Sequence, residues 1–147
     1  MKLAFGCDPN ALHLMETLIN FCKSNDHEVS VYGSDDPIYA NTAIKVGTAV
    51  ASGEADRGIL ICGTGLGMSI TANKVKGAYA ALLTDVYSAE RAVKSNDSNI
   101  ACLGAFTIGE KLAVELIRCW LSASFDPNTA SAEKVKKYKE YDVERMP

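Results

Sequence analysis

The stretch Cys62–Ser69, with the sequence CGTGLGMS, combines a thiol with three glycines in five positions. Glycines allow tight turns and let backbone N–H groups approach a ligand closely, and a helix that starts after such a loop favours negative charge at its N-terminus. A cysteine beside that terminus is present as the thiolate to a larger fraction than an ordinary cysteine. Cys62 is therefore a candidate base, with Thr64 sharing its proton. The loop is a candidate site for an anion, either a phosphate or the oxyanion of an enediolate.

Other interpretations of this loop stay open. Nucleotide binding is disfavoured, because the GxGxG spacing lacks the third glycine of GxGxxG and Lys74 lies too late for a P-loop lysine. Cys62 can also be a small apolar residue that ends a buried strand, as most free cysteines are. The same reasoning assigns the remaining cysteines to core packing: Cys7, Cys22, Cys102 and Cys119.

Two polar residues outside the loop are further candidates. Asp8 follows a β-prone run, so its carboxylate either handles a hydroxyl proton in a cleft or caps the next helix. Asn96 lies in the polar segment KSNDSN at 94–99, where a turn is the ordinary explanation and a hydrogen bond to substrate is the alternative. Neither His13 nor His27 has an evident metal partner, so no metal site is expected.

Short β-prone runs alternate with longer amphipathic stretches along the chain. Strands are expected at 2–8, 28–33, 57–63, 78–83 and 99–104. Helices are expected at 11–25, 39–53, 67–77, 86–96 and 109–125, with one more in the tail, 126–147, capped by Thr129 or Ser131. This order predicts an α/β fold, a three-layer α/β/α Rossmann-like sandwich with a five-stranded parallel sheet and a C-terminal helix. Ligands of such sheets bind at the carboxyl ends of the strands, where Asp8 and Cys62 fall.

The composition limits the class of protein. The chain has 147 residues, of which 48% are hydrophobic and 22% charged, which predicts one globular domain over residues 1–147. A net charge of −3 gives no basic field for nucleic acid. Neither a membrane span nor a signal peptide is apparent, so a cytoplasmic protein is expected. Five cysteines without a CxxC pair indicate neither a disulfide framework nor a zinc site.

The segments GCD, ASGEADRGILICGTGLGMSITANKVKG, YSAERA, SNDSN and CLGAFTIG together resemble the type B ribose-5-phosphate isomerase family, which includes the galactose-6-phosphate isomerase subunits. The resemblance covers nearly the whole chain. It implies reversible aldose–ketose conversion of a phosphorylated sugar through an enediolate, with ribose 5-phosphate as the default substrate. It also implies no metal, no organic cofactor and a homodimer with the active site between subunits, and pairing of dimers into a tetramer stays open. The tail helix is expected to pack on the partner subunit.

The resemblance also implies a role for individual residues. Cys62 would be the base that moves a proton between C1 and C2, with Thr64 assisting. Asp8 and Asn96 would bind sugar hydroxyls, and Tyr39 would lie near the pocket. The backbone around the glycines would form the anion hole, over Gly63, Gly65, Gly67, Met68 and Ser69.

Several positions depart from the family pattern. Pro9 and Ser95 replace two histidines, the second of which is the group that opens the sugar ring. Phe106, Ala130 and Lys134 replace arginines that hold phosphate, and lysine lacks the bidentate fork of arginine.

These departures leave alternative substrates open. Ser95 with Asp8 or a water could still open a ring. New phosphate contacts could come from Lys134, Lys136, Lys137 or Arg145. A four-carbon sugar phosphorylated on O4 needs no ring opening, because it cannot close a furanose through that oxygen. Ser95 and the segment Tyr39–Asn41 also resemble, more loosely, a subgroup that acts on tetrulose 4-phosphates. A hexose 6-phosphate and a non-catalytic sugar-phosphate-binding subunit are the remaining alternatives.

Overall fold

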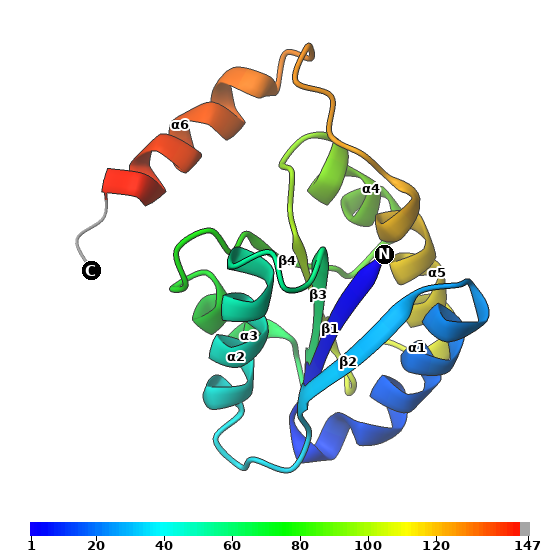
Figure 1. The fold of residues 1–147 in the computed structure, drawn as a ribbon. Coiled ribbons are helices and arrows are strands. Elements are labelled where there is room, and N and C mark those ends of the chain that lie inside the picture. The colour runs from blue at the N-terminus through cyan, green and yellow to red at the C-terminus, as the bar shows by residue number, and fades with distance from the viewer. Residues whose placement is uncertain (145–147) are drawn as a thin grey trace.

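Five parallel strands form one sheet at the centre of the structure, a computed structural model that describes residues 1–144 (Figure 1). The strands are β1 (Lys2–Cys7), β2 (Glu28–Gly33), β3 (Arg57–Cys62), β4 (Ala80–Leu82) and β5 (Ile100–Gly104). They lie in the order β2-β1-β3-β5-β4, so β2 and β4 form the edges. In the register of the sheet, Cys62 lies opposite Gly104 of β5 and Ile61 lies opposite Cys7 of β1. The expected parallel sheet is confirmed.

Helices cover both faces of this sheet. One face carries α1 (Leu12–Ser24), α4 (Val86–Lys94) and α5 (Glu110–Ser122), and the other carries α2 (Tyr39–Ala51) and α3 (Leu66–Ala72). A short 3-10 helix, η1 (Pro9–Ala11), leads into α1, and the tail forms α6 (Ala132–Glu144). The three-layer α/β/α sandwich with a C-terminal helix is therefore confirmed.

The central strands are buried on both sides, which explains their nearly continuous apolar sequences. Successive side chains of a strand point to opposite faces. In β3, Ile59 and Ile61 join the core under α1, α4 and α5, whereas Leu60 and Cys62 join the core under α2 and α3. The period of the strand thus places the Cys62 thiol on the side of the sheet that α3 covers.

The helix expected at 67–77 is too long, because α3 ends at Ala72. The carboxamide of Asn73 explains the difference. Its Nδ2 donates to the carbonyls of Ser69 and Ala80, and its Oδ1 accepts the N–H of Ala80, each at 2.9 Å. These bonds end the helix and fix the start of β4, which is an edge strand of only three residues instead of the expected 78–83.

The tail helix α6 lies beyond the amino ends of the strands, at the opposite end of the sheet from Cys62 (Figure 1). Ser131 precedes it, and the Ser131 carbonyl accepts the N–H groups of Lys134 and Val135, each at 3.1 Å. Helical structure in the tail is therefore confirmed through Glu144, and residues 145–147 lie outside the described part of the chain.

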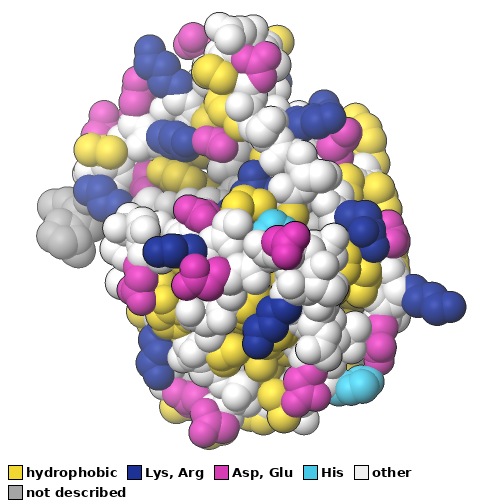
Figure 2. All heavy atoms as spheres, turned by 45° about the vertical axis from the view of Figure 1, so that its right-hand side comes forward, with side chains coloured by type: hydrophobic (Ala, Val, Ile, Leu, Met, Phe, Trp, Pro, Cys, Tyr) yellow, Lys and Arg dark blue, Asp and Glu magenta, His cyan; other side chains and the backbone are white. Residues whose placement is uncertain are grey.

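Positive and negative side chains are interspersed on the face seen in Figure 2, with no extended patch of one sign. Among residues 1–144, no helix has the length and apolar character needed to cross a bilayer.

Candidate active site

Cys62 is the last residue of β3, and the protein holds its sulfur in a defined place. The side chain is only 5% exposed, and its Sγ accepts the backbone N–H of Gly65 at 3.1 Å. Its carbonyl accepts the N–H of Ala105 at 2.8 Å, which ties the loop after β3 to the loop after β5. The thiol therefore lies at the carboxyl edge of the sheet with a backbone donor directed at the sulfur.

The loop after Cys62 needs glycine for backbone reasons. Gly65 has φ +77°, in the left-handed region, and a Cβ there would lie 2.9 Å from the Leu103 carbonyl carbon. A Cβ on Gly104 would lie 2.7 Å from Thr64 Cα. The close packing of these two backbones brings the loops after β3 and β5 together beside Cys62.

The first turn of α3 provides backbone donors next to this thiol. Gly65 is the N-cap residue, so the N–H groups of Gly67 and Met68 have no acceptor within the helix. Three other amides of the loop are already used inside it: Gly65 donates to Cys62 Sγ, Leu66 to Thr64 Oγ1 at 3.3 Å, and Ser69 to the Gly65 carbonyl at 3.0 Å. The available donors are thus fewer than the sequence suggested.

Side chains around the loop have distinct positions. Thr64 is exposed, Gly63 and Ser69 are half-buried, and the side chain of Met68 is fully buried, so only its backbone can face a ligand. Tyr39, the first residue of α2, packs so closely on Gly67 that an added Cβ would overlap its hydroxyl. The structure therefore brings Tyr39 to the glycine loop, as expected.

The turn that delivers Tyr39 is fixed by Asp36. Its Oδ1 accepts the N–H of Ile38 at 2.8 Å, and its Oδ2 accepts Asn41 Nδ2 at 3.0 Å. The hydrogen bonds from Asn41 and Ile38 lower the pKa of Asp36 below its usual value. Asp36 thus remains ionised and holds the start of α2 in place.

Asp8 follows β1 at the same edge, and its carboxylate caps η1. Its Oδ1 accepts both the backbone N–H and the side-chain Nδ2 of Asn10 at 2.9 Å, and its own N–H donates to the Ile61 carbonyl at 2.8 Å. Pro9 is exposed at the first position of η1, where a missing N–H costs nothing. The capping role of Asp8 is therefore present in the structure.

Phe106 is an exposed aromatic residue beside the loop, with 72% of its surface accessible. Its N–H donates to the Gly63 carbonyl at 2.9 Å, and a Cβ on Gly63 would lie 2.9 Å from the Phe106 ring. An apolar ring thus lies directly against the loop that carries the candidate base.

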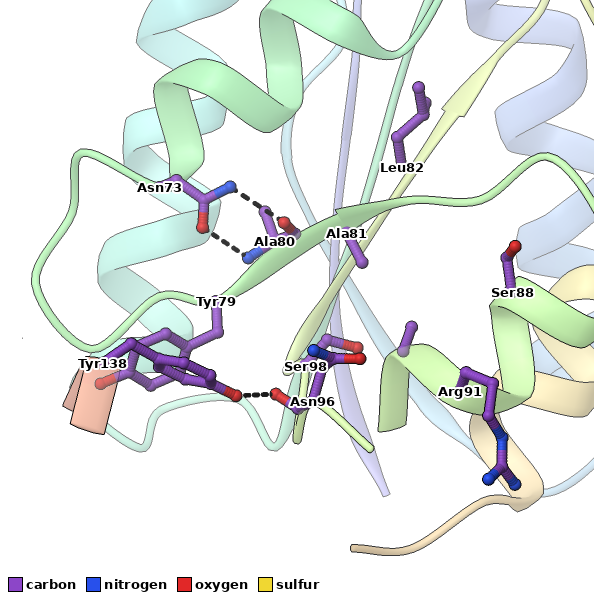
Figure 3. Close-up of a pocket in the computed structure, with 11 residues that line it drawn as sticks. Asn73, Tyr79, Ala80, Ala81, Leu82, Ser88, Arg91, Asn96, Ser98 and Tyr138 are labelled. Carbon is purple, nitrogen blue, oxygen red and sulfur yellow. Dashed lines mark hydrogen bonds between the residues drawn. The ribbon is translucent and has the colours of Figure 1, made fainter. Parts of the chain in front are cut away.

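Ser95, Asn96 and Lys134 lie far from this group within one chain. Ser95 is the C-cap residue of α4, which runs antiparallel to the strands, and Asn96 belongs to the turn that enters the amino end of β5. Asn96 lines a pocket beside the edge strand β4 with Ser98, Arg91 and other residues (Figure 3). Lys134 is exposed on α6 at the same end of the molecule, and Ala130 is exposed just before that helix.

Three of the other cysteines, Cys7, Cys22 and Cys102, are buried in the core. Burial, with smaller contributions from Asp8 and Glu16, raises the pKa of Cys7 to about 11, and burial raises that of Cys22 to about 11. Burial also raises the pKa of Cys102, and Cys119 is half-buried on α5. Thiols with raised pKa values remain protonated at neutral pH, as expected for core residues.

Within residues 1–144, no group of three or more histidine, cysteine, aspartate or glutamate side chains is arranged to hold a metal ion. The residues near Cys62 are instead a thiol, hydroxyls, one carboxylate and backbone amides. That set is suited to proton transfer and to binding an oxyanion.

A family model described as ribose/galactose isomerase matches residues 3–138 of the sequence. The chain belongs to this family. Its membership confirms the resemblance recognised in the motifs and makes the chain a sugar-phosphate isomerase, an enzyme that interconverts aldoses and ketoses.

Individual members of the ribose/galactose isomerase family are similar over nearly their full length. A ribose-5-P isomerase B of Listeria innocua is 46% identical over 136 residues, covering 90% of this chain and 92% of that protein. A D-erythrulose-4-phosphate isomerase of Mycolicibacterium smegmatis is 43% identical over 141 residues, covering 92% and 93%. The solved structure of Clostridium thermocellum ribose-5-phosphate isomerase B superposes with a TM-score of 0.92 at 39% identity, over 98% of this chain and 99% of that one.

The sequence predicted the groups at the carboxyl edge of the sheet but not the residues that surround Asn96. Tyr138 and Lys139 of α6 contact the turn that contains Asn96, and Arg91 lines the same pocket. The polar tail sequence gives little indication of where its helix docks. A usable signal was Tyr138, an aromatic residue among the lysines of the tail.

Proposed function

We propose that the chain is a cytoplasmic, homodimeric, cofactor-independent isomerase that converts ribose 5-phosphate to ribulose 5-phosphate, with Cys62 as the base. The observation that carries this proposal is the placement of Cys62 Sγ beside the first turn of α3, with the Gly65 N–H donating to the sulfur. This amide holds the sulfur next to the first backbone donors of α3. The base and the anion donors therefore lie together at the junction between β3 and α3.

In the proposed reaction, the Cys62 thiolate removes the proton from C2 of the open-chain aldose. The electron pair moves into a C1–C2 double bond, and negative charge develops on the carbonyl oxygen. The amides of Gly67 and Met68 donate to that oxygen, and Thr64 assists proton transfer between the two substrate oxygens. The Cys62 thiol then returns its proton to C1, which gives the ketose and regenerates the thiolate.

The proposed sugar contacts of Ser95, Asn96 and Lys134 require a second subunit. The strand β5 spans four residue steps of about 3.3 Å each, so its two ends lie about 13 Å apart. A small sugar bound at Cys62 therefore does not reach Asn96 of the same chain. A two-fold axis perpendicular to the strands reverses their direction in the partner. Such an axis near the β4 edge would bring the amino end of one sheet beside the carboxyl end of the other.

The tail helix fits the same arrangement. One side of α6 contacts its own chain, whereas Tyr141 is 63% exposed and Val143 is 70% exposed. Apolar groups exposed at the same end as Asn96 support the proposal that the tail also packs on the partner subunit.

A four-carbon sugar phosphate is the second candidate substrate. Two observations favour it: the exposed apolar ring of Phe106 against Gly63, and the position of Ser95 at the end of α4 in place of a ring-opening group. The similarity to the D-erythrulose-4-phosphate isomerase of M. smegmatis supports the same alternative. Pro9 adds no charge or proton-transfer group beside Asp8.

A substrate panel with the purified protein tests the proposal. The values of kcat/KM are compared for ribose 5-phosphate, erythrose and erythrulose 4-phosphates, and hexose 6-phosphates. Preference for ribose 5-phosphate supports the first candidate, and preference for a four-carbon substrate replaces it by the second. Binding without turnover of any aldose or ketose phosphate would leave only the non-catalytic alternative.

A further inference from the structure

The C-terminal part of α6 is fixed to the segment that precedes β4. The buried carboxylate of Asp142, 7% exposed, accepts the N–H of Gly77 at 2.7 Å and the hydroxyl of Tyr79 at 3.1 Å. Lys76 Nζ donates to the Val143 carbonyl at 2.7 Å. A buried carboxylate held by directional hydrogen bonds sets both the position and the rotation of a helix. The Asp142 contacts therefore determine which α6 residues face the sheet.

Residues in the middle of α6 then reach the turn between α4 and β5. The Tyr138 hydroxyl donates to the Asn96 carbonyl, and Lys139 Nζ forms an ion pair with Asp97 Oδ2 (Figure 3 shows the Tyr138 contact). The Tyr138 ring packs against Tyr79, with 5.6 Å between ring centroids. The tail helix thus contacts the backbone of Asn96 and the side chain of the next residue.

The inner half of this turn consists of Ser98 and Asn99. Trp120 Nε1 donates to Ser98 Oγ at 2.9 Å. Asn99 Oδ1 accepts the Tyr79 N–H at 2.7 Å, and Asn99 Nδ2 donates to the Gly77 carbonyl at 2.9 Å. The hydrogen bonds of the Ser98 and Asn99 side chains are therefore made to residues outside α6.

The outer half of the turn depends on α6. Asp97 has φ +47°, a left-handed conformation that non-glycine residues rarely adopt and that needs support from its surroundings. The Asp97 N–H donates to the Val93 carbonyl at 2.8 Å, and Lys139 holds its carboxylate. Burial, with a smaller contribution from Asp97, raises the pKa of Tyr138 to about 12, so its hydroxyl remains a donor at neutral pH.

We propose that Tyr138 and Lys139 are positioning residues that hold Asn96 in the orientation in which it binds substrate. The proposal rests on the proposed function, in which Asn96 contacts a sugar hydroxyl in the partner's site. Neither positioning residue touches the reacting atoms. Their loss therefore weakens substrate binding and leaves the proton transfer at Cys62 largely intact.

A double-mutant cycle tests this coupling in the full-length protein. Lys139→Met is expected to lower kcat/KM about tenfold, mainly through KM, and Tyr138→Phe is expected to lower it several-fold. In an Asn96→Ala background the same changes are expected to have almost no further effect, because the group that they position is gone. Lys139→Arg, which keeps the ion pair with Asp97, is expected to restore most of the loss.

Lys23→Met is the matched control, since it removes an exposed lysine from the end of α1, a helix that packs on β1, β2 and α5. It is expected to leave KM unchanged. Additive losses in the Asn96→Ala background, or an effect on kcat alone, would overturn the positioning role.

Hydrogen exchange separates this proposal from the proposed function. Without substrate, amides of residues 95–98 are expected to exchange faster in Lys139→Met and Tyr138→Phe than in the unsubstituted protein or in Lys23→Met. Unchanged exchange in both α6 variants would show that Tyr138 and Lys139 do not hold the turn, even in an active enzyme. Faster exchange in a protein that converts no sugar phosphate would instead reject the proposed function and retain the role of Tyr138 and Lys139 in holding the turn.

Discussion

The two ends of the sheet hold their candidate groups by different means. At the carboxyl end, backbone geometry fixes Cys62 and its donors, because Gly65 and Gly104 permit contacts that no other residue permits. At the amino end, Asn96 lies on an exposed turn that side chains of α6 hold in place. The proposed chemistry thus depends on backbone geometry, whereas the proposed substrate recognition depends on side chains that can change without disturbing that geometry.

The largest expected effect is on the chemical step at the carboxyl end. Cys62→Ala removes the proposed base and is expected to lower kcat by about 10³-fold or more, with little change in the unfolding midpoint. Steady-state kinetics and thermal unfolding measure the two quantities. Cys119→Ala is the matched cysteine control and is expected to remain active. Full turnover by the Cys62→Ala enzyme would show that Cys62 is not the base.

Gly65→Ala probes whether backbone geometry supports that chemistry. A Cβ at φ +77° would meet Leu82 and the Leu103 backbone, so the substitution is expected to destabilise the fold by about 1–3 kcal/mol and to lower kcat. Urea unfolding and kcat are measured together. Gly53→Ala is the control, because Gly53 has φ +78° but open space around it, and it is expected to affect stability alone. Equal kcat values in the two variants would contradict a special role for the Gly65 backbone.

Substitution of Phe106 is expected to change substrate specificity without changing the proton-transfer step. Removing its ring in Phe106→Ala opens the side of the loop at Gly63 and is expected to change the ratio of kcat/KM between four-carbon and five-carbon phosphates about tenfold. The stability of the fold is expected to stay the same, since the ring is mostly exposed. An unchanged ratio would separate Phe106 from substrate recognition.

The smallest expected effect concerns the α4 helix that carries the Asn96 turn. Asp85 caps α4, and hydrogen bonds from Ser88 lower the pKa of Asp85 below its usual value. Because this pKa is lower in the folded than in the unfolded state, the ionised carboxylate stabilises the fold above the unfolded pKa. That stabilisation is lost as the pH falls through the folded pKa.

Asp85→Ala is therefore expected to lower Tm at pH 7 and to lower it less at pH 3. Thermal unfolding at the two pH values gives the comparison, with Asp126→Ala in the tail linker as a control. An equal decrease in Tm at both pH values would show that the charge of Asp85 does not contribute.

Much of the fold follows from local sequence patterns. The alternation of apolar runs with amphipathic stretches was enough to predict the parallel sheet and its covering helices. The five motif segments together were enough to predict the family. The predicted length of α3 was wrong because the Asn73 side chain bonds to Ala80, seven residues away. The periodicity of the sequence gives no information about such a contact.

The contacts of α6 at the amino end of the sheet could not be predicted from the sequence, for a related reason. The tail is docked through Asp142 and Gly77, which lie 65 positions apart in the sequence. A polar helix of this kind has no apolar stripe that indicates its partner. The separation of Asn96 from Cys62, in contrast, follows from the direction of α4 once the parallel sheet is accepted.

In the proposed homodimer, one active site combines the carboxyl end of one subunit with the amino end of its partner. Subunit mixing tests it most directly. A Cys62→Ala chain and a Ser95→Ala/Asn96→Ala chain are each assayed alone at low substrate concentration and then after co-refolding in equal amounts. In a mixed dimer, one of the two shared sites keeps every group, so random pairing is expected to restore about a quarter of the unsubstituted activity. Activity equal to the mean of the two parent variants would contradict a shared site.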